Sequence, residues 1–329
     1  MKLSAGGEPP LSAFVVINTQ FKKLEMRFIF IVLLFVGFIS KAQKQIAITI
    51  DDLPFVQELS LKHAQESTTK LLSKIKQQKL TTVGFVNENS VYKLGQIDER
   101  VALLDAWLAN GQQLGNHTFS HPSFSKLSLE EFKAETLKGE ILTEKLKQKY
   151  GQTEKYFRFP FLHTGSDSLK KYGFQAFLAE KGYQNAPVTI DADDWVFNKV
   201  YMDALKANNK TLMKEVAEKY LKHTEAYFDY YEKLTQEVAG RPIKHIFLCH
   251  ANALNAEYFN ELIDLMRKRG YTFVTLKEAL QDEIYSRPER VITTNGFSWL
   301  HRWRMTDKKK NTLKDPEIPA NIQALYDGK

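Results

Sequence analysis

The chain has 329 residues, of which 43% are hydrophobic and 26% are charged, which is typical of a globular protein rather than a disordered one. Its formal net charge of +7 falls to +4 without residues 1–42, which hold five Lys/Arg and two Asp/Glu. So small a charge does not indicate nucleic-acid binding, and we expect no nucleic-acid partner. Cys249 is the single cysteine, which excludes a disulfide within the chain.

The first 42 residues have the pattern of a signal peptide with an extra segment before it. Arg27 follows Met26, residues 28–39 carry no charge, and Ser40-Lys41-Ala42 is a small-x-small cleavage site. The apolar run is shorter than the ~20 residues of a membrane span. We predict a signal peptide over residues 26–42 and interpret residues 1–25 as sequence upstream of the true start. The mature protein is then exported, periplasmic or extracellular, without stable membrane insertion.

From residue 43 onward, apolar runs of strand length alternate with helical patterns. In chain order, strands are predicted over residues 45–50, 81–86, 113–116, 156–159, 183–190, 245–249 and 271–274. Between them, helices are predicted over residues 61–78, 97–110, 128–150, 166–181, 210–239 and 256–269, and Thr275 with Glu278 caps a last short helix. This alternation predicts an α/β fold with a parallel sheet and helices on its outside, either open or closed into a barrel, and the number of strands favours a barrel-like form.

Polar residues follow the predicted strands where each strand ends. They are Asp51 and Asp52, His117, Arg158, Asp191 and Asp194, and His250. Active sites of parallel α/β folds lie at the carboxyl ends of the strands. We therefore expect these side chains to meet in one site.

One aspartate and the two histidines of His117-Thr118-Phe119-Ser120-His121-Pro122 can hold a metal ion that keeps an open position. Three protein ligands plus water are typical of hydrolytic sites, whereas structural zinc sites are closed by four. The four-residue spacing predicts that both imidazoles lie on one side of a helical turn, which Pro122 then ends. The sequence therefore predicts an enzyme.

Five motifs in order resemble those of the polysaccharide deacetylases, the NodB homology domain of carbohydrate esterase family 4. They are Asp51-Asp52 after a Thr-containing strand, His117-Thr118-x-x-His121-Pro122, Arg158-Phe159-Pro160-Phe161, Asp191-Ala192-Asp193-Asp194-Trp195 and Leu248-Cys249-His250. The resemblance covers about residues 44–283. It implies a distorted (β/α) barrel that removes acetyl groups from sugar polymers with a divalent metal, usually Zn²⁺, for which Co²⁺ and Ni²⁺ are alternatives.

The resemblance also implies roles for individual residues. Asp51 corresponds to the general base, and the metal ligands correspond to Asp52, His117 and His121. Arg158 corresponds to the arginine that holds the catalytic aspartate. The proximity of a metal and a free carboxylate suits activation of water.

The remaining assignments concern the acid and the substrate. His250 corresponds to the general acid, and Asp194 to the carboxylate that keeps it protonated, with Asp191 and Asp193 as alternatives for that carboxylate. The backbone N–H of Phe161 is expected to help bind the oxyanion. Trp195 is expected either to line the sugar face or to be buried.

Three features depart from the family pattern. Leu53-Pro54 stands where Gly-Pro is common, which affects the shape of a loop. A helical insertion at about 197–240 is expected to pack on the barrel, to cover the sugar groove or to form a dimer contact. The catalytic domain is therefore predicted over residues 43–283, with a C-terminal extension over 284–329 whose Trp299 and Trp303 stack on sugars or clasp the barrel.

The predicted function is a secreted, metal-dependent hydrolase that removes N-acetyl groups from GlcNAc-type sugars of peptidoglycan, chitin or a related glycan. Its expected partner is an acetylated polysaccharide or oligosaccharide. One alternative is an O-acetyl esterase acting on acetylated xylan or a similar polymer. Another is a glycan-binding barrel without catalysis. The sequence does not predict an oligomeric state.

Overall fold

The computed structural model describes residues 43–329, so the predicted signal peptide and its cleavage site after Ala42 lie outside the described residues. Within this part of the chain, no helix is both long and apolar enough to cross a membrane. Residues 44–329 hold all the elements described below.

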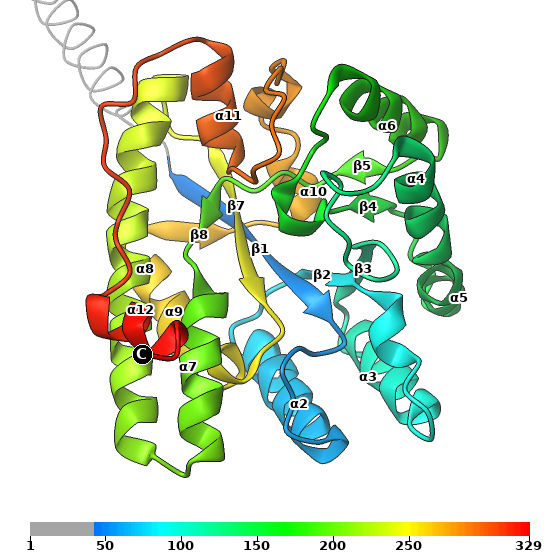
Figure 1. Cartoon of the computed structure of the whole chain (residues 1–329), viewed down its shortest axis with the longest axis vertical. Coiled ribbons are helices and arrows are strands. Elements are labelled where there is room, and N and C mark those ends of the chain that lie inside the picture. Colours follow the sequence, from blue (N-terminus) through cyan, green and yellow to red (C-terminus); the bar gives the residue numbers. More distant parts are fainter. Residues whose placement is uncertain (1–42) are drawn as a thin grey trace, which may run out of the picture. The chain divides into compact units, whose positions relative to one another are not determined.

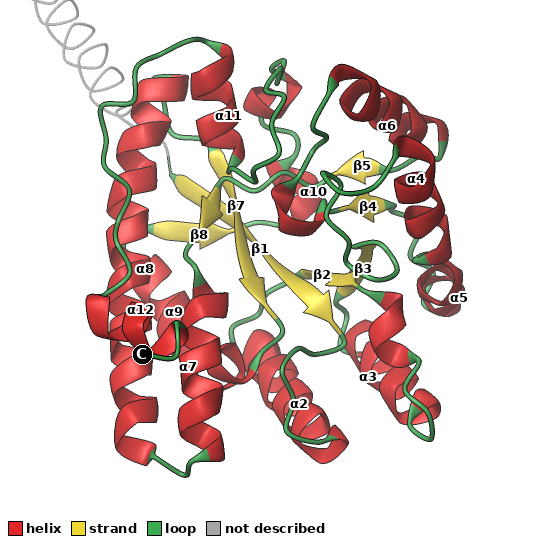
Figure 2. Ribbon diagram, viewed as in Figure 1, coloured by secondary structure: helices red, strands yellow, loops and turns green. Residues whose placement is uncertain are grey.

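The described residues form one parallel sheet of eight strands (Figures 1 and 2). The strands run in the order β5-β4-β3-β2-β1-β7-β6, and β8 also pairs with β1. Their bounds are β1 (Lys44–Leu53), β2 (Val83–Val86), β3 (Gln113–Asn116), β4 (Tyr156–Phe157), β5 (Gln184–Asn185), β6 (Ile190–Asp191), β7 (Lys244–His250) and β8 (Tyr271–Phe273).

Helices surround the sheet, as the alternating pattern predicts (Figure 2). The curled sheet with its outer helices is a distorted (β/α) barrel, and the predicted fold class is confirmed. The helices are α2 (Leu61–Gln77), α3 (Ile97–Ala109), α4 (Leu129–Lys138), α5 (Ile141–Lys149), α6 (Ser168–Glu180), α7 (Asp194–Lys206), α8 (Lys210–Ala239), α9 (Ala253–Lys268), α10 (Leu276–Ala279), α11 (Trp299–Thr306) and α12 (Ala320–Tyr326). Short 3₁₀ helices are η1 (Glu88–Val91), η2 (Pro160–Leu162) and η3 (Glu283–Ser286).

β1 is the central strand, and it is buried on both faces. Ile46, Ile48 and Ile50 are buried on one face, and Ala47 and Thr49 on the other. β1 pairs with β7 over seven residues, and this register places Asp51 opposite His250. The carboxyl ends of the two strands therefore bring a carboxylate and an imidazole to the same edge of the sheet.

The helix predicted over residues 128–150 is instead two helices, α4 and α5, separated at Gly139. The capping box of Ser128 and Glu131 opens α4 as predicted. A Cβ atom on Gly139 would lie 2.5 Å from the backbone of Thr118, so only glycine fits against this loop. The break in the helix lets the loop that carries both histidines pack closely.

The strand predicted over residues 183–190 is also wrong, because it divides into the two-residue strands β5 and β6. Ala186 N donates to Phe157 O on β4, whereas Thr189 N donates to Ile246 O on β7. The chain thus passes from one edge of the sheet to the other between these residues. This crossing carries Asp191 to the neighbourhood of His250, because Asp191 pairs with Leu248.

Candidate active site

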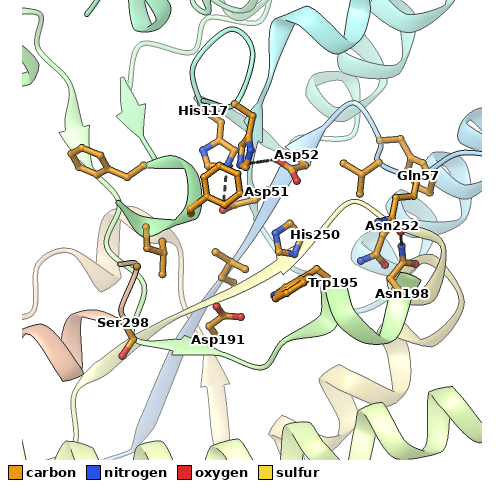
Figure 3. A pocket seen from close by; sticks show the side chains of 18 of the residues that line it. Asp51, Asp52, Gln57, His117, Asp191, Trp195, Asn198, His250, Asn252 and Ser298 are labelled. Atoms are coloured by element: carbon orange, nitrogen blue, oxygen red, sulfur yellow. Dashed lines mark hydrogen bonds and ion pairs between the residues drawn. The ribbon is translucent and has the colours of Figure 1, made fainter. Parts of the chain in front are cut away.

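Five of the polar residues predicted at the strand ends line one cavity of about 940 Å³, namely Asp51, Asp52, His117, Asp191 and His250. The other two do not line it: Arg158 contacts Asp51, and Asp194 contacts His250. Figure 3 shows Asp51, Asp52 and His117 close together, with His250 beside them and Asp191 and Trp195 further along. They come from the carboxyl ends of four parallel strands: Asp51 and Asp52 lie at the end of β1, His117 follows β3, Asp191 ends β6 and His250 ends β7. The expectation that these side chains meet is therefore confirmed in the geometry.

Asp52, His117 and His121 form a group able to hold a metal ion, since one ligand atom of each lies within 4.8 Å of the others. Asp52 Oδ1 lies 3.6 Å from His117 Nε2 and 3.5 Å from His121 Nε2. This buried oxygen has no hydrogen-bond partner among residues 43–329. Since buried polar atoms are normally paired, such an orphaned carboxylate oxygen between two imidazoles fits a divalent cation.

The protonation state of His117 suits the role of a metal ligand. Its Nδ1 lies 2.8 Å from Arg158 O, and because a carbonyl only accepts, Nδ1 carries the proton and Nε2 keeps its lone pair. Burial, together with the nearby His121, holds the pKa of His117 well below its usual value. The imidazole is therefore neutral at pH 7, as metal binding requires.

The prediction that the two histidines share a helical turn is wrong, because residues 117–121 form an irregular loop. Thr118 and His121 have φ of 66° and 56°, in the left-handed region. Asn116 Oδ1 accepts from Thr118 N at 2.7 Å, and Thr118 Oγ1 accepts from His121 N at 3.2 Å. These side-chain bonds replace helical backbone bonds and hold both rings toward Asp52.

Asp51 is buried and contacts Arg158 rather than solvent. Arg158 Nη1 lies 3.3 Å from each oxygen of Asp51, and its Nη2 donates to Thr49 Oγ1 at 2.9 Å. Burial raises the pKa of Asp51 to about 6, against the lowering effect of the Arg158 charge. A carboxylate with this pKa is ionised at pH 7 and still basic enough to accept a proton.

His250 is paired with Asp194, as expected, and not with the alternatives Asp191 or Asp193. Asp194 Oδ1 lies 2.6 Å from His250 Nδ1. Its Oδ2 accepts hydrogen bonds from three further donors, namely His250 N, Asn252 Nδ2 and Asn255 Nδ2. Burial alone would lower the pKa of His250, but the charge and hydrogen bond of Asp194 outweigh it and raise this pKa to about 10. The imidazole is therefore protonated at neutral pH.

The two alternative carboxylates have other contacts. Asp191 lines the cavity, and its Oδ1 accepts from Asp193 N at 3.3 Å. Asp193 has a φ of 53°, and its Oδ2 accepts from Tyr227 OH at 2.8 Å and lies 3.2 Å from His223 Nε2. Both of these partners belong to α8.

Phe161 and Trp195 are exposed aromatic residues at the cavity. Phe161 is 53% exposed, and its ring centroid lies 4.4 Å from that of His121. Trp195 is 45% exposed, which decides between the two predicted positions in favour of a surface that lines the cavity. Its ring meets Tyr326 of α12 edge to face at 5.5 Å.

Sequence reasoning missed several residues of the site. Asn252 and Asn255, which fix Asp194, follow His250 closely, and Asn252 caps α9 through Asn255 N, so a helix-cap signal was present. His223 and Tyr227 gave no signal beyond helical spacing. A further set lines the cavity from the C-terminal part of the chain, namely Gly296, Phe297, Ser298, His301 and Asp315.

Comparisons with known proteins find similarity to polysaccharide deacetylases. A sequence model of the family described as "Polysaccharide deacetylase" matches residues 39–177. A peptidoglycan-N-acetylglucosamine deacetylase of Bacillus cereus is 27% identical over 151 residues, 46% of this chain and 46% of that protein, so the match spans about half the length of this relative. A chitin deacetylase of Colletotrichum lindemuthianum is 25% identical over 240 residues, 72% of this chain and 79% of that protein.

A solved structure shares the fold. It is a mutant, with restored enzymatic activity, of a CE4 family pseudoenzyme from Bacillus anthracis. The TM-score is 0.50 at 18% identity, and the alignment covers 73% of this chain and 69% of the other.

Proposed function

Because the chain belongs to the polysaccharide deacetylase family, we propose that it is a metal-dependent hydrolase that removes N-acetyl groups from GlcNAc-type sugars of a glycan such as peptidoglycan or chitin. The observation that carries this proposal is the separation of three roles around one cavity. An Asp/His/His group is free to hold a cation, a second carboxylate is held apart by Arg158, and a protonated imidazole lies across the sheet edge from that carboxylate.

Asp52, His117 and His121 would hold the metal ion, for which Zn²⁺ is the first candidate and Co²⁺ or Ni²⁺ are alternatives. A divalent cation in this group would polarise the acetyl carbonyl and lower the pKa of a water molecule. The Oδ1 atom of Asp52 is a buried carboxylate oxygen without a hydrogen-bond partner among the described residues, and it lies between the two imidazoles.

Residues of the chain itself accept and donate the protons of the reaction. Asp51 accepts the proton of the attacking water, and Arg158 keeps Asp51 ionised and oriented. His250 donates its proton to the departing nitrogen and regains a proton from solvent, while the Asp194 carboxylate orients the ring and stabilises its protonated form. The backbone N–H of Phe161 is assigned to the oxyanion, and the rings of Phe161 and Trp195 to contact with the sugar.

The protonated state of His250 favours an amide over an ester as the substrate. An amine must be protonated as it leaves, whereas an alcohol is the easier leaving group and depends less on an acid. A cavity imidazole whose pKa is raised to about 10 meets the need of the amide. We therefore rank the O-acetyl esterase second. The non-catalytic barrel ranks below both, because the full set of base, acid and ligand candidates is retained.

We also propose that residues 26–42 act as a signal peptide, on the evidence of their charge and hydropathy pattern. The catalytic domain and its C-terminal extension keep their predicted limits of 43–283 and 284–329. Export would bring the enzyme to glycans outside the cytoplasm.

The test is acetate release from a panel of N-acetylated and O-acetylated sugars, with enzyme treated with a chelator and then resupplied with zinc. We expect release from N-acetylated sugars, loss with the chelator and recovery with zinc. Asp51→Asn should retain zinc in elemental analysis but lose at least ~100-fold in kcat, since general-base catalysis contributes roughly 10²–10⁴-fold. Asp203→Asn on the surface of α7 is the matched control. Undiminished acetate release by the Asp51 variant would remove this residue from the chemistry.

A further inference from the structure

The two ends of the cavity differ in construction. At one end, Ser298, His301 and Tyr231 line the cavity and are buried, with 4%, 8% and 4% exposure. At the other end, the lining side chains of Gln57 and Lys93 are exposed. Figure 3 shows Ser298 and Asp191 on one side of His250, with Asn198 and Gln57 on the opposite side. The cavity thus has one open end and one closed end.

The closed end is built by the C-terminal part of the chain, chiefly residues 296–301, which we call the end wall. Its residues lie outside the predicted catalytic domain of 43–283, and also outside the region that the family model matches, 39–177. Asp315, from the segment after α11, lines the cavity near His301, but its side chain is 54% exposed and does not contribute to the closed surface. This end is therefore added to the barrel by a separate segment of sequence.

The end wall is held firmly to the barrel. Trp299 N donates to Val188 O at 2.7 Å. Arg302 is buried and donates to Leu162 O at 2.8 Å and to Thr164 Oγ1 at 2.9 Å. These bonds join the wall to the segments on both sides of the site, after β4 and before β6.

Two further contacts leave the wall no room to move aside. A Cβ atom on Gly296 would lie 1.8 Å from Phe161 O, so the backbone of the wall lies directly on η2. His301 Nδ1 lies 2.7 Å from Ser298 Oγ and its Nε2 lies 2.8 Å from Tyr230 OH of α8. A ligand that continued through this end would have to displace buried, hydrogen-bonded side chains.

We propose that the end wall blocks further sugar units on one side of the reacting unit. The enzyme would then deacetylate a terminal sugar or a short oligosaccharide rather than units inside a long polymer. This inference rests on the proposed deacetylase function. The cavity volume of about 940 Å³ is within the range of sites that hold a small ligand. Asp191 and Ser298 give the closed end oxygen atoms that suit the hydroxyl groups of a chain end.

The experiment uses the chain from residue 43 onward, loaded with zinc, on N-acetylglucosamine oligosaccharides from the disaccharide to the hexasaccharide and on long glycan. The oligosaccharides carry ¹⁸O at the reducing end, so fragment masses show which unit lost its acetyl group. We expect deacetylation at one terminal unit whatever the length, and a kcat/KM that stops rising once the cavity is filled. Deacetylation of interior units at a comparable rate would overturn the inference.

A pair of variants tests the wall itself. Phe297→Ala removes a half-buried ring that lines the cavity, and Ile292→Ala removes an exposed apolar side chain of the same segment that does not. We expect the Phe297 variant to raise the ratio of interior to terminal deacetylation about tenfold, in the range that pocket shape controls. The Ile292 variant should keep the wild-type ratio, and thermal melting checks that both are folded.

The possible outcomes separate this inference from the proposed function. Acetate release from every unit of every substrate would leave the deacetylase intact and refute the end wall's role. An unchanged ratio in the folded Phe297 variant would also count against the wall. No acetate from any sugar, in a protein shown to hold zinc, would refute the proposed function and this inference with it.

Discussion

The pairing of His250 with Asp194 sets the protonation state of the candidate acid. The imidazole faces the negative charges of Asp194, Asp52 and Asp51, of which Asp194 contributes most to raising its pKa to about 10. An acid is active while protonated, so on the alkaline side of the profile kcat/KM should fall as the pH rises through this pKa. Asp194→Asn removes the partner charge while burial continues to lower the pKa.

We therefore expect the alkaline limb of the pH profile in Asp194→Asn to move to lower pH by about one unit or more, where one unit corresponds to 1.36 kcal/mol. The measurement is kcat/KM on one N-acetylated substrate from neutral to strongly alkaline pH. Asp203→Asn changes the same residue type on the surface of the same helix and should keep the wild-type limb. If both variants show the wild-type limb, His250 is not the acid.

The metal group makes a prediction that does not depend on activity. His117→Ala removes one of the three side chains around the orphaned oxygen of Asp52. Zinc affinity should fall by more than the about 10- to 100-fold that loss of an outer hydrogen bond costs. Competition with a zinc indicator measures it.

His163→Ala is the matched control for this measurement. His163 lies near the cavity, but its Nδ1 is engaged by Ser123 Oγ at 2.8 Å. Its removal should leave zinc affinity unchanged. Equal affinity in the His117 variant and the wild type would assign the metal to other residues.

At the scale of single residues, the types of the site residues could be predicted from the sequence, whereas their local geometry could not. Asp51, Asp52 and His117 follow strands, and strand ends of a parallel sheet must converge, so their meeting was predictable. The shape of the loop between the two histidines was not, because it depends on Asn116 and on the close packing of Gly139 from a later helix. Likewise, the choice of Asp194 over its neighbours depends on the left-handed turn at Asp193.

At the scale of elements, α8 has a part in the site that its pattern does not reveal. The helix spans Lys210–Ala239, the range predicted from helical spacing, because it buries one apolar face against its neighbours. From that face, His223 and Tyr227 reach Asp193, the residue before Asp194. Periodicity predicts which residues face inward, but not which partners they meet there.

Tyr227→Phe tests this support for the Asp194 turn. The variant loses one donor to Asp193, and a hydrogen bond to a charged group contributes about 1.5–3 kcal/mol. We expect kcat to fall about tenfold, which corresponds to 1.4 kcal/mol of the barrier, with little change in KM. Steady-state kinetics over a range of substrate concentrations separates the two constants.

Tyr271→Phe on β8 is the control for this variant, because its hydroxyl also donates to a carboxylate, that of Glu232, away from the cavity. It should keep both constants. A fall in stability without a fall in kcat in the Tyr227 variant would show that α8 supports the fold alone.

At the scale of the whole described chain, the alternation of strands and helices predicted the parallel sheet with outer helices, and the number of strands favoured the barrel. The last segment was not predictable in the same way, because α11 is only eight residues long and carries three basic or imidazole side chains among its apolar ones. Arg302 illustrates the difficulty, since a charged residue in a polar tail is normally exposed and this one is buried. Its partners, such as Leu162 O, are far away in the sequence.

The burial of this segment predicts that it contributes to global stability. Trp303 is 1% exposed within the main hydrophobic cluster, so Trp303→Ala should lower the free energy of unfolding by about 3–5 kcal/mol. Met305→Ala, on the exposed side of the same helix, should change it by less than about 1 kcal/mol. Urea denaturation followed by circular dichroism measures both, and similar small losses would mean that α11 is dispensable for folding.

The single cysteine, Cys249, is a natural probe of the strands that carry the site. Cys249 lies on β7 between Leu248 and His250, is fully buried, and directs its thiol to Thr49 O of β1 at 3.8 Å. Burial raises the pKa of this thiol well above its usual value, so reagents in solution reach a reactive thiolate only when the two strands part. The rate of chemical labelling of Cys249 in the native protein would therefore measure how often β1 and β7 separate next to Asp51 and His250. No mutation is needed to introduce a probe.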